Sequence, residues 1–103
     1  MVYSLLIKKR IQSYDITIFQ TPKFGEKKGY HVVYRCMIKG QSHQHVMEKV
    51  FQTFNVADTM PSDYEARYLS TGDIVLIDEG KKGQFYYKLK PEGWKRINRI
   101  HVR

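Results

Sequence analysis

Apolar and polar residues alternate along the first part of the chain in the way that β-strands require. Residues 14–20 are mainly β-branched and aromatic, and the strand that they predict places Ile16 and Ile18 on the same face. Residues 21–29 contain a proline, two glycines and three lysines, which is a turn composition. A second strand over residues 30–38 should therefore return antiparallel to the first.

The spacing of apolar residues changes from two to about four after Ser42. Five apolar side chains then follow one helical stripe: Val46, Met47, Val50, Phe51 and Phe54. This stripe predicts an amphipathic helix of roughly three turns, with Ser42 as its N-cap and Asn55 at its end. Residues 55–68 lack a period and predict a connector, with one short helical turn over residues 62–66.

The last third of the chain predicts three more strands. Residues 74–77 are apolar, and a glycine-bounded turn at residues 78–83 connects them to a partner strand at residues 84–89. A second turn at residues 90–93 leads into a further strand at residues 94–97 and then into a basic tail. Two consecutive hairpins are therefore expected here.

The remaining apolar stretch, residues 2–7, has no clear period. It is compatible with a strand or a short helical turn, and we prefer the strand. The order strand, strand, helix, strand, strand, strand predicts an α+β fold in which one helix packs on a small antiparallel sheet of about five strands. The length of 103 residues fits a single domain, residues 1–103.

The net charge of +8 is unevenly distributed along the chain. Residues 1–39 hold eight basic and two acidic side chains, residues 40–80 hold two and seven, and residues 81–103 hold eight and one. Such asymmetry favours an anionic partner for the basic surface. Nucleic acid, membrane lipid and an acidic protein surface all meet this requirement, and charge alone does not choose among them.

The sequence lacks the motifs of common enzyme and cofactor sites. It contains no GxSxG nucleophile elbow, phosphate-binding P-loop, HExxH motif or dinucleotide-binding glycine fingerprint. His43 and His45 have no further ligand nearby for a zinc ion, so solvent-exposed positions at the helix start are favoured for both. We therefore expect no catalysis, no cofactor and no metal.

Several sequence features point to a cytoplasmic protein without membrane insertion. No apolar stretch approaches the roughly 20 residues that cross a bilayer. The N-terminal basic cluster follows a short apolar run, which is the reverse of a secretion signal. The single Cys36 cannot form an internal disulfide, and its apolar-rich strand favours a buried or half-buried structural thiol.

Aromatic residues alternate across the strand predicted at residues 84–89. Phe85 and Tyr87 share one face, where a packing role is favoured, and Tyr86 takes the other face beside Lys88 and Lys90. Aromatic rings interleaved with lysines also suit single-stranded nucleic acid, in which bases stack and phosphates meet cations. We expect Tyr86 and its lysines to remain accessible to a partner.

The Gly72-Asp73 step lies at the entrance of the strand predicted at residues 74–77. A glycine there supplies a backbone conformation that is costly for other residues, and Asp73 can accept hydrogen bonds from nearby turn amides. A structural role is therefore favoured over a catalytic one for both residues.

A solvated basic end is one interpretation of the C-terminal tail. Against it, the tail keeps apolar residues among its basic ones, which is unusual for a frayed terminus. Trp94 together with Arg96 and Arg99 has the composition of an interface hot spot. The candidate partner-binding residues are Tyr86, Lys88, Lys90, Trp94, Lys95, Arg96, Arg99, His101 and Arg103.

Several stretches of the sequence resemble the YodL-like family of small Bacillus proteins. They are YDITIFQTPKFGEKKGYHVVYR at residues 14–35, KVFQTFN at residues 49–55, and LSTGDIVLIDEGKKGQFYYKL followed by GWKRINRIHVR in the last third. The most specific part is a serine-x-glycine-aspartate step before an apolar strand, followed by a glycine turn and a paired-tyrosine strand. A related pattern is similar to domains in large proteins of mobile elements.

The resemblance implies a non-enzymatic regulator, made in sporulating cells, that binds the bacterial actin homologue MreB and disturbs cell shape. It transfers no site residue, so the interface rests on charge and aromatic placement. An acidic surface of an MreB-like partner would suit the basic surface of this chain. The alternative is a basic nucleic-acid-binding module of mobile-element origin, which would show salt-dependent binding to DNA or RNA.

Overall fold

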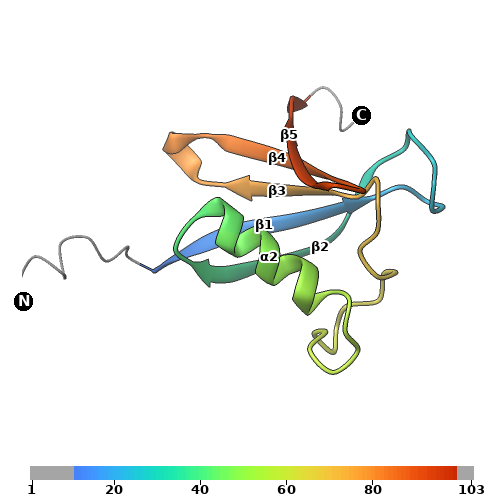
Figure 1. Ribbon diagram of the computed structural model, residues 1–103, viewed down its shortest axis with the longest axis horizontal. Helices are drawn as coiled ribbons and strands as arrows, with labels where there is room; N and C mark the ends of the chain where they lie inside the picture. Colours follow the sequence, from blue (N-terminus) through green and yellow to red (C-terminus); the bar gives the residue numbers. More distant parts are fainter. Residues whose placement is uncertain (1–10, 100–103) are drawn as a thin grey trace, which may run out of the picture.

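The computed structural model describes residues 11–99, which form one α-helix and a five-stranded antiparallel sheet (Figure 1). The elements are β1 (Gln12–Gln20), β2 (His31–Gly40), α2 (His43–Thr53), β3 (Ile74–Asp78), the 3₁₀ turn η1 (Gly80–Lys82), β4 (Gln84–Lys90) and β5 (Gly93–Ile97). The predicted α+β fold is confirmed. The strand preferred for residues 2–7 lies outside the described residues. No helix in residues 11–99 is long and apolar enough to span a bilayer.

The strand order is β2-β1-β3-β4-β5, so β1 lies between β2 and β3. The helix and the connector after it therefore carry the chain from β2, at one edge, past β1 to β3 (Figure 1). The pairing of β1 with β2 shifts register between Ile18 and Phe19, which marks a bulge that increases local twist. We call the face of the sheet that packs against α2 the inner face and the opposite face the outer face.

A side-chain cap and a close backbone contact determine where α2 begins. The Ser42 hydroxyl accepts a hydrogen bond from the His45 amide at 3.1 Å, which confirms the predicted N-cap. At the end of β2, a Cβ on Gly40 would lie 2.5 Å from Cγ2 of Val46. Glycine at this position therefore lets the strand and the helix approach closely.

The main core lies between α2 and the inner face. Its buried residues are Tyr14, Ile16, Ile18, Val46, Met47, Val50, Phe54, Tyr64, Leu69, Val75 and Ile77. Four residues of the predicted helical stripe are thus confirmed as core, but Phe51 is 42% exposed and that part of the prediction is wrong. Phe51 lies on the flank of α2 toward Leu89 and Trp94, where no second helix of the described chain covers the sheet.

A second, smaller apolar cluster lies on the outer face. Its buried members are Ile74, Leu76 and Tyr86, and Phe19, Tyr30 and Ile97 pack against them. The prediction that Tyr86 stays accessible is wrong, because its exposure is only 7%. Leu76 and Ile97 stand directly opposite Tyr86 on the two neighbouring strands, and the centroid of the Phe19 ring lies 6.2 Å from that of Tyr86. Cross-strand packing therefore covers this ring.

The connector between α2 and β3 has a hydrogen-bonded turn at residues 61–64 in place of the helical turn predicted for residues 62–66. The Tyr64 amide donates to the Pro61 carbonyl at 3.1 Å, and the chain then continues without helical structure. The Tyr64 ring packs on Phe54, with ring centroids 4.9 Å apart. Anchoring this aromatic ring in the core outweighs a short helix, which has little intrinsic stability.

Candidate interaction surfaces

Strand alternation divides the predicted partner-binding residues between the two faces of the β4–β5 hairpin. Lys88 and Lys95 stand opposite each other on the outer face, which also holds the buried Tyr86. Trp94 packs against the main core on the inner face, and the Arg96 guanidinium lies there over an aromatic ring. Because neighbouring residues on a strand point to opposite sides, one flat partner cannot contact all of them.

The three C-terminal candidates can be placed only in part. Arg99 is exposed beyond the end of β5, and His101 and Arg103 lie outside the described residues. Two candidate surfaces therefore remain within residues 11–99, one on each face of the sheet.

The first surface is a group of four basic residues, Lys27, Lys88, Lys90 and Lys95, which we call the outer lysine cluster. Burial, followed by the charges of Lys90 and Lys27, lowers the pKa of Lys88. Lys95 stands directly across from Lys88 on β5. In the part of the chain that the structure describes, none of the four forms an ion pair with a carboxylate. The cluster is therefore an uncompensated concentration of positive charge.

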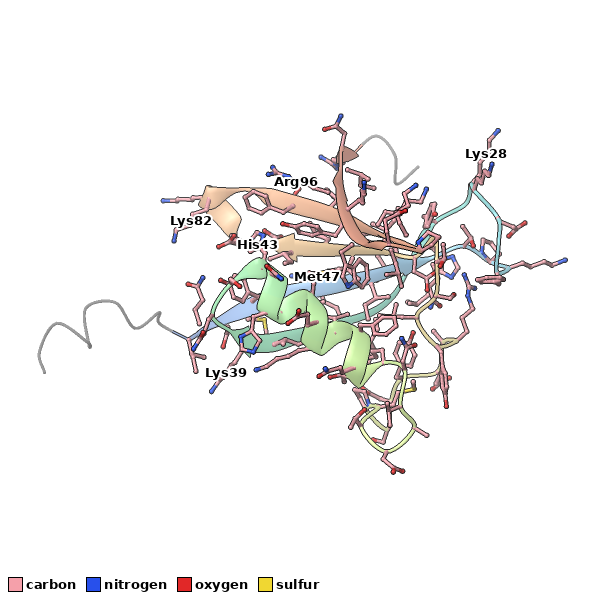
Figure 2. All side chains as sticks on the ribbon, viewed as in Figure 1. Lys28, Lys39, His43, Met47, Lys82 and Arg96 are labelled. Atoms are coloured by element: carbon pink, nitrogen blue, oxygen red, sulfur yellow. The ribbon has the colours of Figure 1, made fainter. Side chains whose placement is uncertain are left out.

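The second surface is a groove between α2 and the β4–β5 hairpin, which we call the inner groove. Two cavities of about 680 and 450 Å³ form it and share Glu48, Gly93 and Trp94. Its main walls are His43, Met47, Phe51, Tyr87, Leu89 and Trp94. Figure 2 shows His43 and Met47 along the side of the helix that faces β3 and β4. The groove exists because α2, the one helix among residues 11–99, cannot cover the whole inner face of five strands.

A hydrogen-bonded chain of three side chains closes one end of the inner groove. Nε2 of His43 lies 2.5 Å from a Glu79 carboxylate oxygen, and Nδ1 lies 2.7 Å from the Tyr87 hydroxyl. Because an ionised carboxylate only accepts, Nε2 is the donor to Glu79. Burial raises the pKa of Tyr87, so the phenol stays protonated. These hydrogen bonds join α2 to the β3–β4 hairpin.

The prediction that both histidines at the helix start are solvent-exposed is wrong. The side chain of His43 is only 24% exposed and packs edge-on against the rings of Tyr14 and Phe85. His45 is half-buried, and its Nδ1 accepts a hydrogen bond from the Gln41 amide at 3.1 Å. Among residues 11–99, no group of three or more histidine, cysteine or acidic side chains could hold a metal ion.

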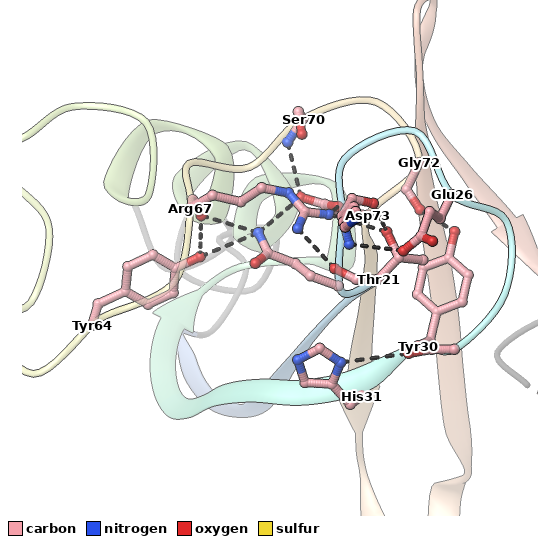
Figure 3. A network of polar contacts seen from close by, with 12 residues as sticks. Thr21, Glu26, Tyr30, His31, Tyr64, Arg67, Ser70, Gly72 and Asp73 are labelled. Atoms are coloured by element: carbon pink, nitrogen blue, oxygen red, sulfur yellow. Dashed lines mark hydrogen bonds and ion pairs between the residues drawn. The ribbon is translucent and has the colours of Figure 1, made fainter.

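A buried polar network surrounds Asp73 at the entrance of β3 (Figure 3). The Asp73 carboxylate accepts hydrogen bonds from the Gln20 side-chain amide and the Ser70 backbone amide, each at 3.0 Å. It also pairs with the Arg67 guanidinium at 3.4 Å. Burial raises the pKa of Asp73, and these three partners oppose the rise. The predicted hydrogen bond from a turn amide is therefore confirmed, and the carboxylate is committed to internal contacts.

No sequence signal indicated that two members of this network, Gln20 and Arg67, would contact Asp73. Gln20 and Arg67 are 53 and 6 residues from Asp73 along the chain, and neither belongs to a recognisable motif. Gly72, beside Asp73, has a φ of +101°, which explains the glycine in the serine-x-glycine-aspartate step. Its carbonyl accepts a hydrogen bond from the Tyr30 hydroxyl, so the step also ties the β1–β2 loop to β3.

Cys36 is half-buried in β2, as predicted. Burial, followed by the charges of Asp15 and Asp63, raises the pKa of its thiol from 9.0 to about 11. At about pH 8 its thiolate fraction should be roughly a hundredfold lower than that of an ordinary thiol. We expect alkylation by iodoacetamide to be slower than that of glutathione by a similar factor, and to accelerate as the pH rises. Equal rates at about pH 8 would contradict the burial of this thiol.

Comparison of this chain with known proteins identifies the family to which it belongs. The family model described as a YodL-like domain matches residues 5–99. A Bacillus subtilis (strain 168) protein named "Uncharacterized protein YodL" is 59% identical over 97 residues, covering 94% of this chain and 93% of that protein. No solved structure gives a significant match. The family match extends from before β1 to beyond β5 and so contains both candidate surfaces, and this chain belongs to the YodL-like domain family.

Proposed function

We propose that this protein is a non-enzymatic regulator that binds an acidic surface of an MreB-type actin homologue and thereby disturbs cell shape. The resemblance to the YodL-like family implies this partner, and membership of the family supports it. The relative in Bacillus subtilis matches almost the whole chain, so the complete fold, with its basic surface, is the unit to test.

The observation that carries the proposal is the outer lysine cluster. Like charges that stand directly opposite on neighbouring strands destabilise a sheet, as Lys88 and Lys95 do here. Half-burial of Lys88 adds a desolvation cost that an acidic partner would offset. Carboxylates on that partner would also steer its approach, since the rest of the basic surface is positively charged like the cluster and attracts them.

Two groups that could have suggested catalysis have structural roles in this fold, which supports a binding function. The Asp73 carboxylate is held by three internal partners, and burial keeps the Tyr87 phenol protonated. A general base or nucleophile needs an accessible group with a pKa near the working pH. Neither residue has that combination.

We expect the double substitution Lys88→Gln/Lys95→Gln to weaken binding to purified MreB about tenfold, because each cation at the surface contributes roughly 0.2–1 kcal/mol to such an interface. The measurement is a titration at low and at physiological salt. Wild-type binding should weaken as salt rises, and the variant should show less of this dependence. The substitution removes a like-charge pair, so its melting temperature should not fall.

A matched control is Lys81→Gln/Lys82→Gln, which removes two exposed cations from η1. Figure 2 shows Lys82 at the end of the sheet opposite the loop that carries Lys28. Binding should be nearly unchanged in this control. The proposal fails if the wild-type protein neither binds MreB nor changes cell width on overexpression, or if both double variants bind alike.

The outer lysine cluster also suits phosphate groups, which keeps a nucleic-acid-binding module as the second candidate function. That alternative relied on Tyr86 as a stacking platform for bases, and the buried ring leaves only the phosphate contacts. A mobility-shift titration at low salt distinguishes the two functions. Tight binding of DNA or RNA that Lys88→Gln/Lys95→Gln abolishes would favour nucleic acid as the partner.

A further inference from the structure

The inner groove combines apolar walls with an acidic rim in a protein of net charge +8. We propose that this groove binds a segment of a partner protein in which an arginine is flanked by large apolar side chains. Of the outer lysine cluster, only Lys90 lines the groove, whereas Lys88 and Lys95 lie on the opposite face of the sheet, so the inference does not depend on the proposed function.

The apolar part of the argument rests on the flank of α2 that the sheet leaves open. Met47 is only 2% exposed, whereas Phe51, one turn further along the same flank, is 42% exposed. Phe51 lines the smaller cavity together with Leu89 and Trp94. A large exposed aromatic side chain beside a buried leucine and a half-buried tryptophan is typical of a pocket that receives an apolar side chain.

The charge of the partner follows from the larger cavity. Its lining includes two carboxylates, Glu48 and Glu92, and no lysine or arginine. Both glutamates are exposed, and in residues 11–99 neither forms an ion pair. The rings of Trp94 and Tyr87 form part of the same wall. Aromatic rings and two unpaired carboxylates in the same cavity lining favour a cation. A planar guanidinium stacks on such rings better than an ammonium does.

A contact between a guanidinium and an aromatic ring already exists within this protein, beside the groove. The Arg96 guanidinium lies 4.8 Å from the centroid of the Phe85 ring. Arg96 is therefore engaged by an aromatic ring of its own and does not line either cavity. Lys90 lines only the smaller cavity, so the guest arginine belongs at the end of the groove near His43 and its apolar neighbours at the end near Phe51.

The acidic rim also decides against other classes of partner. Phosphate groups of nucleic acid or of a lipid surface would approach Glu48 and Glu92 with the same sign of charge. A peptide segment supplies a cation and apolar side chains together. With Lys88 and Lys95 on the opposite face, the protein could hold an acidic partner and an arginine-bearing partner at once.

Trp94 is the single tryptophan of the chain, so its fluorescence reports directly on the groove. The probes are two capped peptides, Gly-Leu-Leu-Arg-Leu-Leu-Gly and the same peptide with neutral citrulline in place of arginine. We expect the arginine peptide to change the fluorescence and to bind about tenfold more tightly than the citrulline peptide. Equal affinities, or no binding of either peptide up to about 1 mM, would overturn the proposal.

Variants of the full chain locate the two parts of the site. Glu48→Gln/Glu92→Gln should remove the preference for arginine and keep the weaker apolar binding, whereas Phe51→Ala should weaken both peptides alike. Lys88→Gln/Lys95→Gln, which tests the proposed function on the outer face, should leave peptide binding unchanged. If Glu48→Gln/Glu92→Gln instead abolishes a self-association of the protein, the occupant is a second copy of this chain and the assignment to a partner protein is wrong.

Discussion

We expect Asp73→Ala to lower the free energy of unfolding by about 3–5 kcal/mol, because breaking a buried charge pair leaves the remaining partners uncompensated. Asp73 is 2% exposed and accepts hydrogen bonds from Gln20 and from the Ser70 amide. Without the carboxylate, the Arg67 guanidinium keeps a charge in a half-buried site and two donors lose their acceptor. Urea unfolding followed by Trp94 fluorescence and by far-ultraviolet circular dichroism measures the loss.

The control for this substitution is Ser70→Ala, three residues earlier in the chain. The Ser70 hydroxyl is buried without a hydrogen-bond partner in the described residues, and the backbone amide of Ser70 is the group that Asp73 uses. Ser70→Ala should therefore change stability by less than about 0.5 kcal/mol, since it removes an unsatisfied group and keeps the amide. Similar losses for both substitutions would show that the carboxylate network contributes little.

The substitution Phe54→Ala should destabilise the protein by about 3–5 kcal/mol, because it leaves a cavity at the centre of the main core. Phe54 is 1% exposed, and its ring lies 5.5 Å from that of Tyr34 and 4.9 Å from that of Tyr64. Alanine preserves the backbone bond from residue 54 to the Val50 carbonyl that ends α2. The effect is thus confined to packing, and the midpoint of urea unfolding should fall while the slope stays similar.

Phe51→Ala is the matched comparison, since it makes the same chemical change three residues earlier. Phe51 is 42% exposed in the inner groove, and alanine favours the helix. We expect a loss of about 1 kcal/mol or less, since only part of the side chain is removed from water. A loss as large as that of Phe54→Ala would mean that the groove is closed by another part of the protein. A loss of about 3–5 kcal/mol is a large share of the free energy of unfolding of a domain, which is only about 5–15 kcal/mol in total.

Patterns with a short range along the chain were sufficient to predict the five strands and the α-helix of residues 11–99. The two-residue alternation around Ile16 and Ile18 identified β1, and the four-residue spacing with a serine N-cap identified α2. Both signals depend on a few neighbouring residues, so no knowledge of the fold is needed to recognise them. The alternation of Phe85, Tyr86 and Tyr87 likewise predicted correctly which rings share a face.

Which of those rings remains accessible depends on contacts that are distant in the sequence. Tyr86 is covered by Phe19 of β1 and Ile97 of β5, because β3 and β4 follow β1 in the sheet order. The bond between His43 and Glu79 and the bond between Gln20 and Asp73 span 36 and 53 residues. A composition or a periodicity contains no information about such pairs.

The sequence by itself determined that the C-terminal third is basic and aromatic, that it forms two hairpins, and that it carries the marks of the YodL-like family. Only the tertiary structure decided that its residues make two surfaces. Strand alternation puts Lys88 and Lys95 on one face and Trp94 on the other. In the described part of the chain, α2 is the one helix and covers only part of the inner face, because the chain crosses that face once, between β2 and β3.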